Sequence, residues 1–566
     1  MFRQPGDDEI SPSNIKFEQT RTRFPRTTPP NRVQETLQIG FWDTGSLTST
    51  SLRHLAAFNV TSKVVDIIRN PTRLLETQHM YIISQSTLRG FMAAFLVAGF
   101  GSSLSAEQSR PNVLLILSDD HSVPHVSCYD DENTKRFKIT PNLRKFAEQG
   151  MRFDRAYTSA PQCAPSRISI FTCRSPVGLG VTRFAQPPRG DVRFFTDVLR
   201  ANGYWVGLDG RHQHLDGRVR EAEHIDRALR EAGMQSLDER FDHFVRSAGT
   251  KGDNLLRVAD RVAAALDKVP DEKPFFLYFG FSQPHRKFAL KYDGIDPSEL
   301  KLPADWPDLP EVRVDYARYL ASVRELDHGF GLIMHLLKTR GIEDNTLVIF
   351  MGDNGEALLR GKGTLFDRGT HVPLMIRWPG RVKPGSNSSA LVCGTDLGPT
   401  ILSACGMKPL KEMTGVSFFR QLLGEKAEDR RYVFAERGWH WGPITRTDGL
   451  DLSRSITSTH YRYIYNALPN RAYTPVDMPG MDAWKAIQSA HSASTLSLLH
   501  DRLYFQNPRP IVELYDLRND PLELNNLAGK KSVADMEQTL REELESWMIR
   551  EHDFLPLPTH ALQNTK

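Results

Sequence analysis

The part of the sequence that decides the fold is the apolar run Asn112-Val113-Leu114-Leu115-Ile116-Leu117-Ser118, which leads directly into Asp119-Asp120-His121. A short, continuous apolar run of this kind is typical of a parallel strand that is covered on both faces. Two adjacent carboxylates at the end of such a strand repel each other unless a cation lies between them. The Asp-Asp pair is therefore either a solvated turn or the first part of a cation site.

Three later runs repeat the order of apolar strand, polar terminus and helix. They span residues 204–208, 274–281 and 346–351, and helical spacing appears at residues 253–269 and 316–340. This alternation predicts an α/β fold with a doubly wound, mostly parallel sheet sandwiched by helices. A sheet of this class gathers the carboxyl ends of its strands along one edge, where a site is expected.

Oxygen-bearing side chains end two of these strands. Asp119 and Asp120 follow the first, and Asp353 and Asn354 follow the fourth. Oxygen ligands without a nearby thiolate pair or paired histidines suit a hard divalent cation, Ca²⁺ more readily than Zn²⁺. The alternative, that these carboxylates are general acid and base partners, is weaker because histidines and a lysine are also available.

Basic side chains follow the same strands. Arg211 and His214 come after the second run, His285 after the third, and Lys362 lies between two glycines after the fourth. Each position taken alone is typical of an exposed loop. Gathered at one sheet edge, they place positive charge where an oxyanion would bind.

The segment Cys163-Ala164-Pro165-Ser166-Arg167 is predicted to begin a helix. Pro165 lacks a backbone N–H and suits the first turn, and an apolar run follows. Cys163 then lies at a helix N-terminus, where unpaired N–H groups and the helix dipole favour a deprotonated nucleophile and a bound oxyanion. Arg167, about one turn later, reaches the same anion. The alternative is a buried structural cysteine before an ordinary helix.

These five residues, followed by an apolar stretch and Thr172-Cys173-Arg174, resemble the signature of the type I sulfatases, which belong to the alkaline phosphatase superfamily. The resemblance covers nearly the whole chain after residue 110. The positions that match the family's metal, nucleophile and sulfate-binding residues occur in the family's order: residues 111–120, 163–167, His285, Asp353-Asn354 and Lys362.

The resemblance implies a chemistry for the site. A formylglycine-generating maturation enzyme would oxidise Cys163 to formylglycine, whose hydrated form is the nucleophile. One Ca²⁺, with Mg²⁺ the lesser candidate, would be held by residue 163 and the oxygen ligands named above. Arg167, Arg211 and Lys362 would offset negative charge. Either His285 or His214 would protonate the leaving group, and the other histidine would serve as base.

The reaction implied is hydrolysis of a sulfate ester or sulfamate on a sulfated saccharide. Two alternatives remain: a phosphonate or phosphate ester hydrolase of the same superfamily, and a non-catalytic protein that binds sulfated glycans. The form Gly-Arg-x-x-His-Leu-Asp-Gly and the segment 436–440 most resemble the branch that includes heparan N-sulfatase. Two departures stand out: Cys173 replaces a glycine, and residues 210–214 carry one extra residue where the family has Gly-Lys-Trp-His.

Length and composition set the organisation of the chain. Its 566 residues exceed a single core, so a catalytic domain is expected at residues 107–410 and a smaller α+β subdomain at 411–566, with a short antiparallel sheet near 461–465 and a final helix at 532–551. The 72 basic and 68 acidic residues nearly balance. We therefore expect no nucleic-acid partner, and no stable membrane insertion because no apolar run after the first hundred residues is long enough.

The first hundred residues have a different character. Residues 1–79 show no sustained periodicity and are expected to be disordered or absent from the mature protein. Met80, Arg89, an apolar run and small residues up to Ala106 resemble a signal peptide, which predicts translation from Met80 and export to the periplasm or the medium. The alternative is a genuine extension before a short buried helix. In an oxidising compartment the four cysteines other than Cys163 allow three disulfide pairings.

Overall fold

A computed structural model gives the structure of the protein. It describes residues 110–183, 186, 188–216, 223–246, 255–427, 430–440 and 449–563, all within one compact unit. The predicted extension at residues 1–79 and the predicted signal peptide at 80–106 lie outside the described residues.

The largest sheet has eight strands in the order β5-β4-β6-β1-β7-β8-β2-β9. β1 is central and pairs in parallel with β6 and β7, and β4 pairs in parallel with β5 and β6, whereas β8 runs antiparallel to β7 and β2. The predicted doubly wound, mostly parallel sheet is confirmed. The strands are β1 (Asn112–Asp119), β2 (Met151–Phe153), β4 (Trp205–Asp209), β5 (His243–Val245), β6 (Phe275–Pro284), β7 (Thr346–Gly352), β8 (Leu374–Arg377) and β9 (Ser386–Ser388).

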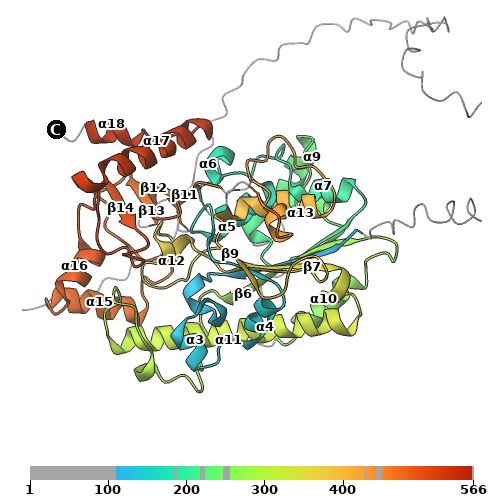
Figure 1. The fold of residues 1–566 in the computed structure, drawn as a ribbon, viewed down its shortest axis with the longest axis horizontal. Helices are drawn as coiled ribbons and strands as arrows, with labels where there is room; N and C mark the ends of the chain where they lie inside the picture. Colours follow the sequence, from blue (N-terminus) through green and yellow to red (C-terminus); the bar gives the residue numbers. More distant parts are fainter. Residues whose placement is uncertain are drawn as a thin grey trace, which may run out of the picture. The chain divides into compact units, whose positions relative to one another are not determined.

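Helices cover both faces of this sheet (Figure 1). On one face lie α5 (Cys163–Thr172), α7 (Phe195–Ala201) and α13 (Leu397–Ala404), and on the other lie α4 (Pro141–Glu148), α10 (Val258–Leu266) and α11 (Pro310–Thr339). Alternate residues of β1 enter two separate cores: Leu115 packs in the first and Leu114 in the second. Because both faces are buried, the strand reads as an unbroken apolar run.

The remaining elements of the α/β part are short. They are α3 (Glu132–Arg136), β3 (Ala156–Tyr157), α6 (Pro176–Leu179), α8 (Gln213–Asp216), α9 (Glu223–Glu231), α12 (Asp367–Thr370), β10 (Val392–Cys393) and α14 (Phe419–Leu422).

Helix α11 begins earlier than the sequence pattern predicts. Its first residue is Pro310, whereas the pattern placed the start at residue 316. Proline suits the first helical position because its missing N–H has no partner there in any case. The first turn carries polar residues that blur the apolar periodicity, so the pattern alone locates only the later turns.

The C-terminal part is a four-stranded antiparallel sheet with helices, as predicted. It contains β11 (Val433–Trp439), β12 (Leu450–Thr457), β13 (Tyr461–Asn466), β14 (Val512–Asp516), α15 (Asp482–Ser492), α16 (Leu498–Phe505), α17 (Ala534–Arg550) and α18 (Pro558–Gln563). The rings of Phe434 and Trp547 stack at 5.1 Å, joining α17 to β11. Trp484 packs in a core beside Tyr504.

The cysteines form no disulfide. All five lie in the described residues and have free thiols. Cys173 ends α5 in the left-handed region, with φ 58°. Its Sγ occupies the space that a side chain at Gly398 would need, 2.1 Å from the position of a Cβ there. The glycine at 398 thus makes room for a cysteine at a position where the resemblance implies glycine.

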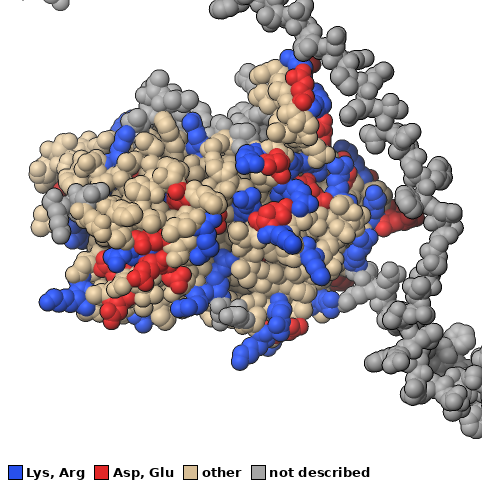
Figure 2. Space-filling view, turned by 90° about the horizontal axis from the view of Figure 1, so that it is seen from above, with Lys and Arg blue, Asp and Glu red and all other residues tan. Residues whose placement is uncertain are grey.

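The distribution of surface charge and the apolarity of the helices are relevant to nucleic-acid and membrane partners. On the face shown in Figure 2, Lys and Arg side chains are interspersed with Asp and Glu. Within the part of the chain that the structure describes, no helix has the length and apolarity needed to cross a membrane.

A buried ion-pair network joins the C-terminal sheet to the α/β part. The guanidinium of Arg462, on β13, donates to Glu523 at 2.8 Å and to Asp367, in α12, at 3.0 Å. Arg462 is fully buried. Removing one partner of a buried pair leaves an uncompensated charge, which costs more than a surface pair contributes.

We predict that Arg462→Ala lowers the free energy of unfolding by about 3–5 kcal/mol, because Glu523 and Asp367 lose their shared cation. Denaturant unfolding followed by circular dichroism measures the change. Arg518→Ala is the matched control, since the Arg518 side chain is 48% exposed and pairs with Asp516 at the surface. A loss no larger for Arg462→Ala than for this control would contradict the role of the network.

Candidate active site

The carboxyl edge of the large sheet brings the predicted site residues together. Asp119 is the last residue of β1 and Asp120 follows it, and Asp353 and Asn354 follow β7, its neighbour. These four side chains have no exposed surface. Asn354 Nδ2 donates to Asp120 Oδ1 at 2.9 Å, and the Asp120 backbone N–H donates to Asp353 Oδ1 at 3.0 Å.

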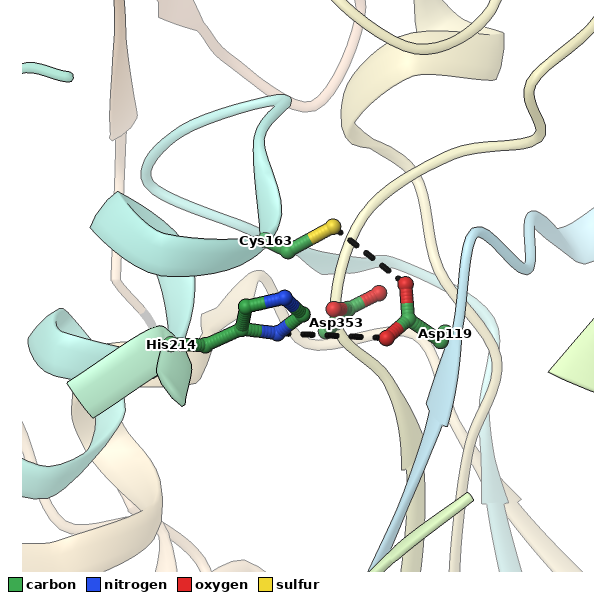
Figure 3. A group of neighbouring side chains, drawn as sticks. All are labelled: Asp119, Cys163, His214 and Asp353. Carbon is green, nitrogen blue, oxygen red and sulfur yellow. Dashed lines mark hydrogen bonds and ion pairs between the residues drawn. The ribbon is translucent and has the colours of Figure 1, made fainter. Parts of the chain in front are cut away.

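Cys163 is the first residue of α5, as the sequence predicts, and it points at the carboxylates. Its Sγ donates to Asp119 Oδ1 at 3.2 Å and to Asp120 Oδ1 at 3.6 Å. Figure 3 shows Cys163, Asp119, Asp353 and His214 converging on one point from separate elements.

The expectation of a deprotonated thiol is wrong for the unmodified residue. Burial raises the pKa of the Cys163 thiol well above its usual range, and the charge of Asp119 raises it further. These effects outweigh the helix N-terminus, so the thiol stays protonated. An ordinary cysteine here would be a poor nucleophile.

Arginines hold the carboxylates in place. Arg167 donates from Nε to Asp353 Oδ2 at 2.8 Å and from Nη2 to Asp119 Oδ2 at 3.2 Å, and it also bonds the Tyr278 hydroxyl. Arg211 forms a second ion pair with Asp119. His214 Nδ1 lies 3.9 Å from the same carboxylate, so the loop with the extra residue delivers both Arg211 and His214 to the site.

The cations do not fully offset the buried negative charge. Burial alone would raise the pKa of Asp119, but Arg211 and Arg167 hold it well below its usual value. For Asp120 and Asp353 burial prevails, and the pKa of each is raised to about 6 despite Lys362 and Arg167 respectively. A further positive charge between these carboxylates would favour their ionised forms.

The donor set fits a hard divalent cation. Asn354 Oδ1 is buried and accepts no hydrogen bond from any described residue. Oxygen and sulfur atoms of Asp119, Asp120 and Cys163 lie with a nitrogen of His285 within 4.8 Å of one another. Carboxylates with an amide oxygen are the ligands that Ca²⁺ and Mg²⁺ prefer. Asp119, Asp120, Asp353 and Asn354, with residue 163, would hold such an ion.

Lys362 and His285 occupy the outer side of the site. Lys362 Nζ lies 2.9 Å from Asp120 Oδ1 and 2.8 Å from Asp477 Oδ2. His285 Nε2 lies 3.8 Å from Asp120 and 3.9 Å from Asp477. The side chains of His285 and Asp477 are 25% and 26% exposed, whereas Lys362 is buried, so solvent meets the site beside this pair.

Asp477 is a site residue that sequence reasoning missed. It belongs to the irregular segment between β13 and α15 and pairs with His440 Nε2 at 3.3 Å as well as with Lys362. Its backbone has φ 62°, a left-handed conformation that costs energy for a residue other than glycine. No motif surrounds it, so only the fold shows that it faces Lys362.

The segment 436–440, noted in the sequence, lies beside the nucleophile. Gln162, which precedes α5, donates from Nε2 to the Trp439 carbonyl at 3.1 Å and lies 3.2 Å from His440 Nδ1. Trp439 therefore lies near the site and could stack on a sugar, whereas Trp484 is buried in a core. Trp441 lies outside the described residues.

Comparison with known families decides the family. The model of the family described as Sulfatase matches residues 111–407, more than half of the chain. The chain belongs to the sulfatase family. Residues 355–465 of this sulfatase also match the family described as N-sulphoglucosamine sulphohydrolase, C-terminal.

Individual relatives are similar over most of their length. The sulfatase is 28% identical to an ulvan-active sulfatase of Formosa agariphila, over 80% of this chain and 82% of that protein. It is 27% identical to the human N-sulphoglucosamine sulphohydrolase, over 79% of this chain and 91% of that protein.

Solved structures share the fold. One is a protein in complex with its substrate D-glucosamine-2-N,6-O-disulfate, with a TM-score of 0.59, 19% identity, and coverage of 79% of this sulfatase and 99% of that chain. Another is a phosphonate monoester hydrolase from Silicibacter pomeroyi, with a TM-score of 0.58 and 21% identity. The match covers 78% of this sulfatase and 96% of that chain.

We predict that Asp477→Asn lowers both kcat and KM for a sulfated substrate. Lys362 and His440 lose a charged partner that positions them, so kcat falls by about tenfold. Removing a negative charge beside an anion site strengthens ground-state binding, so KM falls. Steady-state kinetics measures both constants, and Asp501→Asn, at a surface pair with His491, is the control. Unchanged kcat and KM for Asp477→Asn would show that Asp477 does not position the site.

Proposed function

We propose that this sulfatase hydrolyses a sulfate ester or sulfamate on a saccharide, with residue 163 as formylglycine and Ca²⁺ as the metal. The observation that carries the proposal is the position of Cys163. It begins a helix and contacts Asp119 and Asp120, and Asn354, whose Oδ1 accepts no hydrogen bond from a described residue, contacts the same Asp120. The protonated, buried thiol supports use of this position after oxidation rather than as a cysteine nucleophile.

The side chains around residue 163 have separate tasks. When bound, a divalent cation polarises sulfate oxygens and lowers the pKa of the nucleophilic hydroxyl. Asp119 and Asp120 flank the reactive end of residue 163 and keep it oriented. Lys362 and Arg211 offset charge on the sulfuryl oxygens, and Arg167, fully buried between Asp119 and Asp353, holds the ligands in position.

His285 and His214 are the proposed proton donor and base. Burial lowers the pKa of His285 to about 4 and that of His214 well below its usual value, so both rings are neutral at neutral pH before substrate arrives. An anionic substrate beside them favours the protonated form. His285, which is partly exposed, is placed to protonate a leaving group that departs toward solvent.

For the substrate we propose the N-sulfate group of a glucosamine unit. Two similarities support this choice: the family match at residues 355–465 and the human N-sulphoglucosamine sulphohydrolase. The proposal further includes maturation by a formylglycine-generating enzyme and export before the protein meets its glycan.

The test of the substrate is sulfate release from paired glucosamine saccharides by protein matured with a formylglycine-generating enzyme. We predict release from the saccharide with an N-sulfate and none from the one with only a 6-O-sulfate. Release from the 6-O-sulfated saccharide alone would keep the sulfatase chemistry and overturn the N-sulfate assignment. Faster hydrolysis of an aryl phosphate than of the matched aryl sulfate would favour the phosphate ester alternative.

We predict that Cys163→Ser stalls after a single turnover. Serine can attack sulfur and release the alcohol or amine, but its sulfate ester lacks the second hydroxyl through which the hydrated aldehyde expels sulfate. Rapid-quench measurement should show a burst of about one product per enzyme molecule followed by no further release. Sustained turnover by the serine variant, purified free of wild-type protein, would refute the role of formylglycine.

A further inference from the structure

A cavity in the C-terminal part is lined in part by the loop that carries Lys362. It has a volume of about 400 Å³, within the range of small-molecule sites. Its walls come from the C-terminal end of α16, from β14 and the segment after it, and from Arg360 and Phe366 in the loop that follows β7.

The cavity is lined by more positive than negative charge. Arg360, Arg502, Arg509 and Lys530 line it, and Glu513 is the one carboxylate among the residues that line it. Glu513 already accepts hydrogen bonds from Asn466 Nδ2 at 2.7 Å and from the Tyr515 hydroxyl at 2.5 Å. Both carboxylate oxygens of Glu513 are therefore occupied by protein donors. Glu513 does not neutralise the four basic side chains that line the cavity.

Two of these cations pair with no described carboxylate, although Arg502 Nη2 donates to the Leu524 carbonyl at 3.0 Å. Arg360 lies 3.5 Å from Asp305, and Arg509 pairs with Asp451 at 2.8 Å. Arg502 and Lys530 are exposed and form no ion pair with any residue in the described part of the chain. Arg509 also keeps a buried Nε that donates to no described acceptor. The side chains of Arg502 and Lys530 and the Nε of Arg509 can therefore donate hydrogen bonds to a sulfate or carboxylate.

The wall also offers groups that bind sugar rings. Tyr473 and Phe366 present aromatic surface, and Asn525 and Asn526 present amides that can bond hydroxyl groups. An apolar ring face with a few convergent polar groups is the usual lining of a small-molecule site. The combination points to an anionic saccharide rather than to a free inorganic anion.

The cavity is close to the catalytic centre along the chain. Arg360 is two residues from Lys362, so their Cα atoms are at most about 7 Å apart. The Arg360 backbone N–H donates to the Tyr473 hydroxyl at 2.8 Å, and Tyr473 is in the same segment as Asp477. The loop after β7 and the segment after β13 therefore each contribute residues to both the cavity and the catalytic centre.

We propose that this cavity binds a sulfated or carboxylated sugar unit of a glycan, at a site separate from the catalytic centre. The inference rests on the proposed function for the identity of the glycan.

The test is equilibrium binding of a heparin tetrasaccharide, which carries sulfates and carboxylates, to the full-length Cys163→Ala protein with Ca²⁺. Saturating glucosamine N-sulfate occupies the catalytic centre during the titration. We expect Arg502→Gln/Lys530→Gln to raise the Kd about tenfold. Lys273→Gln/Lys408→Gln removes the same charge at exposed positions that do not line the cavity, and should leave the Kd unchanged within about twofold.

The outcomes distinguish binding of a glycan from binding of free sulfate. They also distinguish failure of the cavity proposal from failure of the proposed sulfatase activity. An equal Kd for the cavity variant and its control, or no binding of the tetrasaccharide, would overturn the cavity proposal. Displacement by an equal concentration of inorganic sulfate would reduce it to a site for the free ion and overturn it likewise. The single variant Lys530→Gln, exposed and unpaired among described residues, repeats the test if the double variant misfolds. Failure of the proposed function appears elsewhere, as absence of sulfate release by the matured wild-type enzyme.

Discussion

The structure depends on the offsetting of buried negative charge at the carboxyl edge of one sheet. Asp119, Asp120 and Asp353 meet there without exposed surface, and Arg167 lies between two of them. Carboxylates removed from water are stable only with cations or strong donors beside them. Arg167, Arg211 and Lys362 supply part of that charge, and the raised pKa of Asp120 and of Asp353 indicates that a deficit remains. A divalent cation held by these carboxylates would fill that deficit and would supply Lewis-acid chemistry.

The C-terminal part completes this site as well as packing against it. Asp477 reaches Lys362 from the segment after β13, and Arg462 on β13 pairs with Asp367, five residues after Lys362 in the chain. The loop that carries Lys362 is thus held on one side by the carboxylate cluster and on the other by the small sheet. The same loop also lines the cavity in the C-terminal part, which we propose as a second anion-binding site.

Most of the fold and most of the site follow from local sequence patterns. The apolar run before Asp119 predicts a doubly covered strand, and Pro165 predicts a helix that starts beside Cys163; both have causes that act within a few residues. Asp477 could not be predicted, because its role depends on a contact with Lys362 across more than a hundred positions of chain. The pKa of Cys163 could not be predicted either, since burial among three carboxylates reverses the effect of the helix end. The early start of α11 could not be predicted because Val312 is the one buried apolar residue in a first turn that otherwise carries polar residues and proline.

The measurement that tests the central claim most directly is the metal content of the matured protein, determined by elemental analysis beside the Asn354→Ala variant. The account predicts one divalent ion per chain in the wild type. We predict a substoichiometric amount in the variant, because alanine removes the buried Oδ1, which accepts no hydrogen bond from any described residue and can bind the ion. A wild-type protein that releases sulfate while holding no stoichiometric divalent ion would contradict the account.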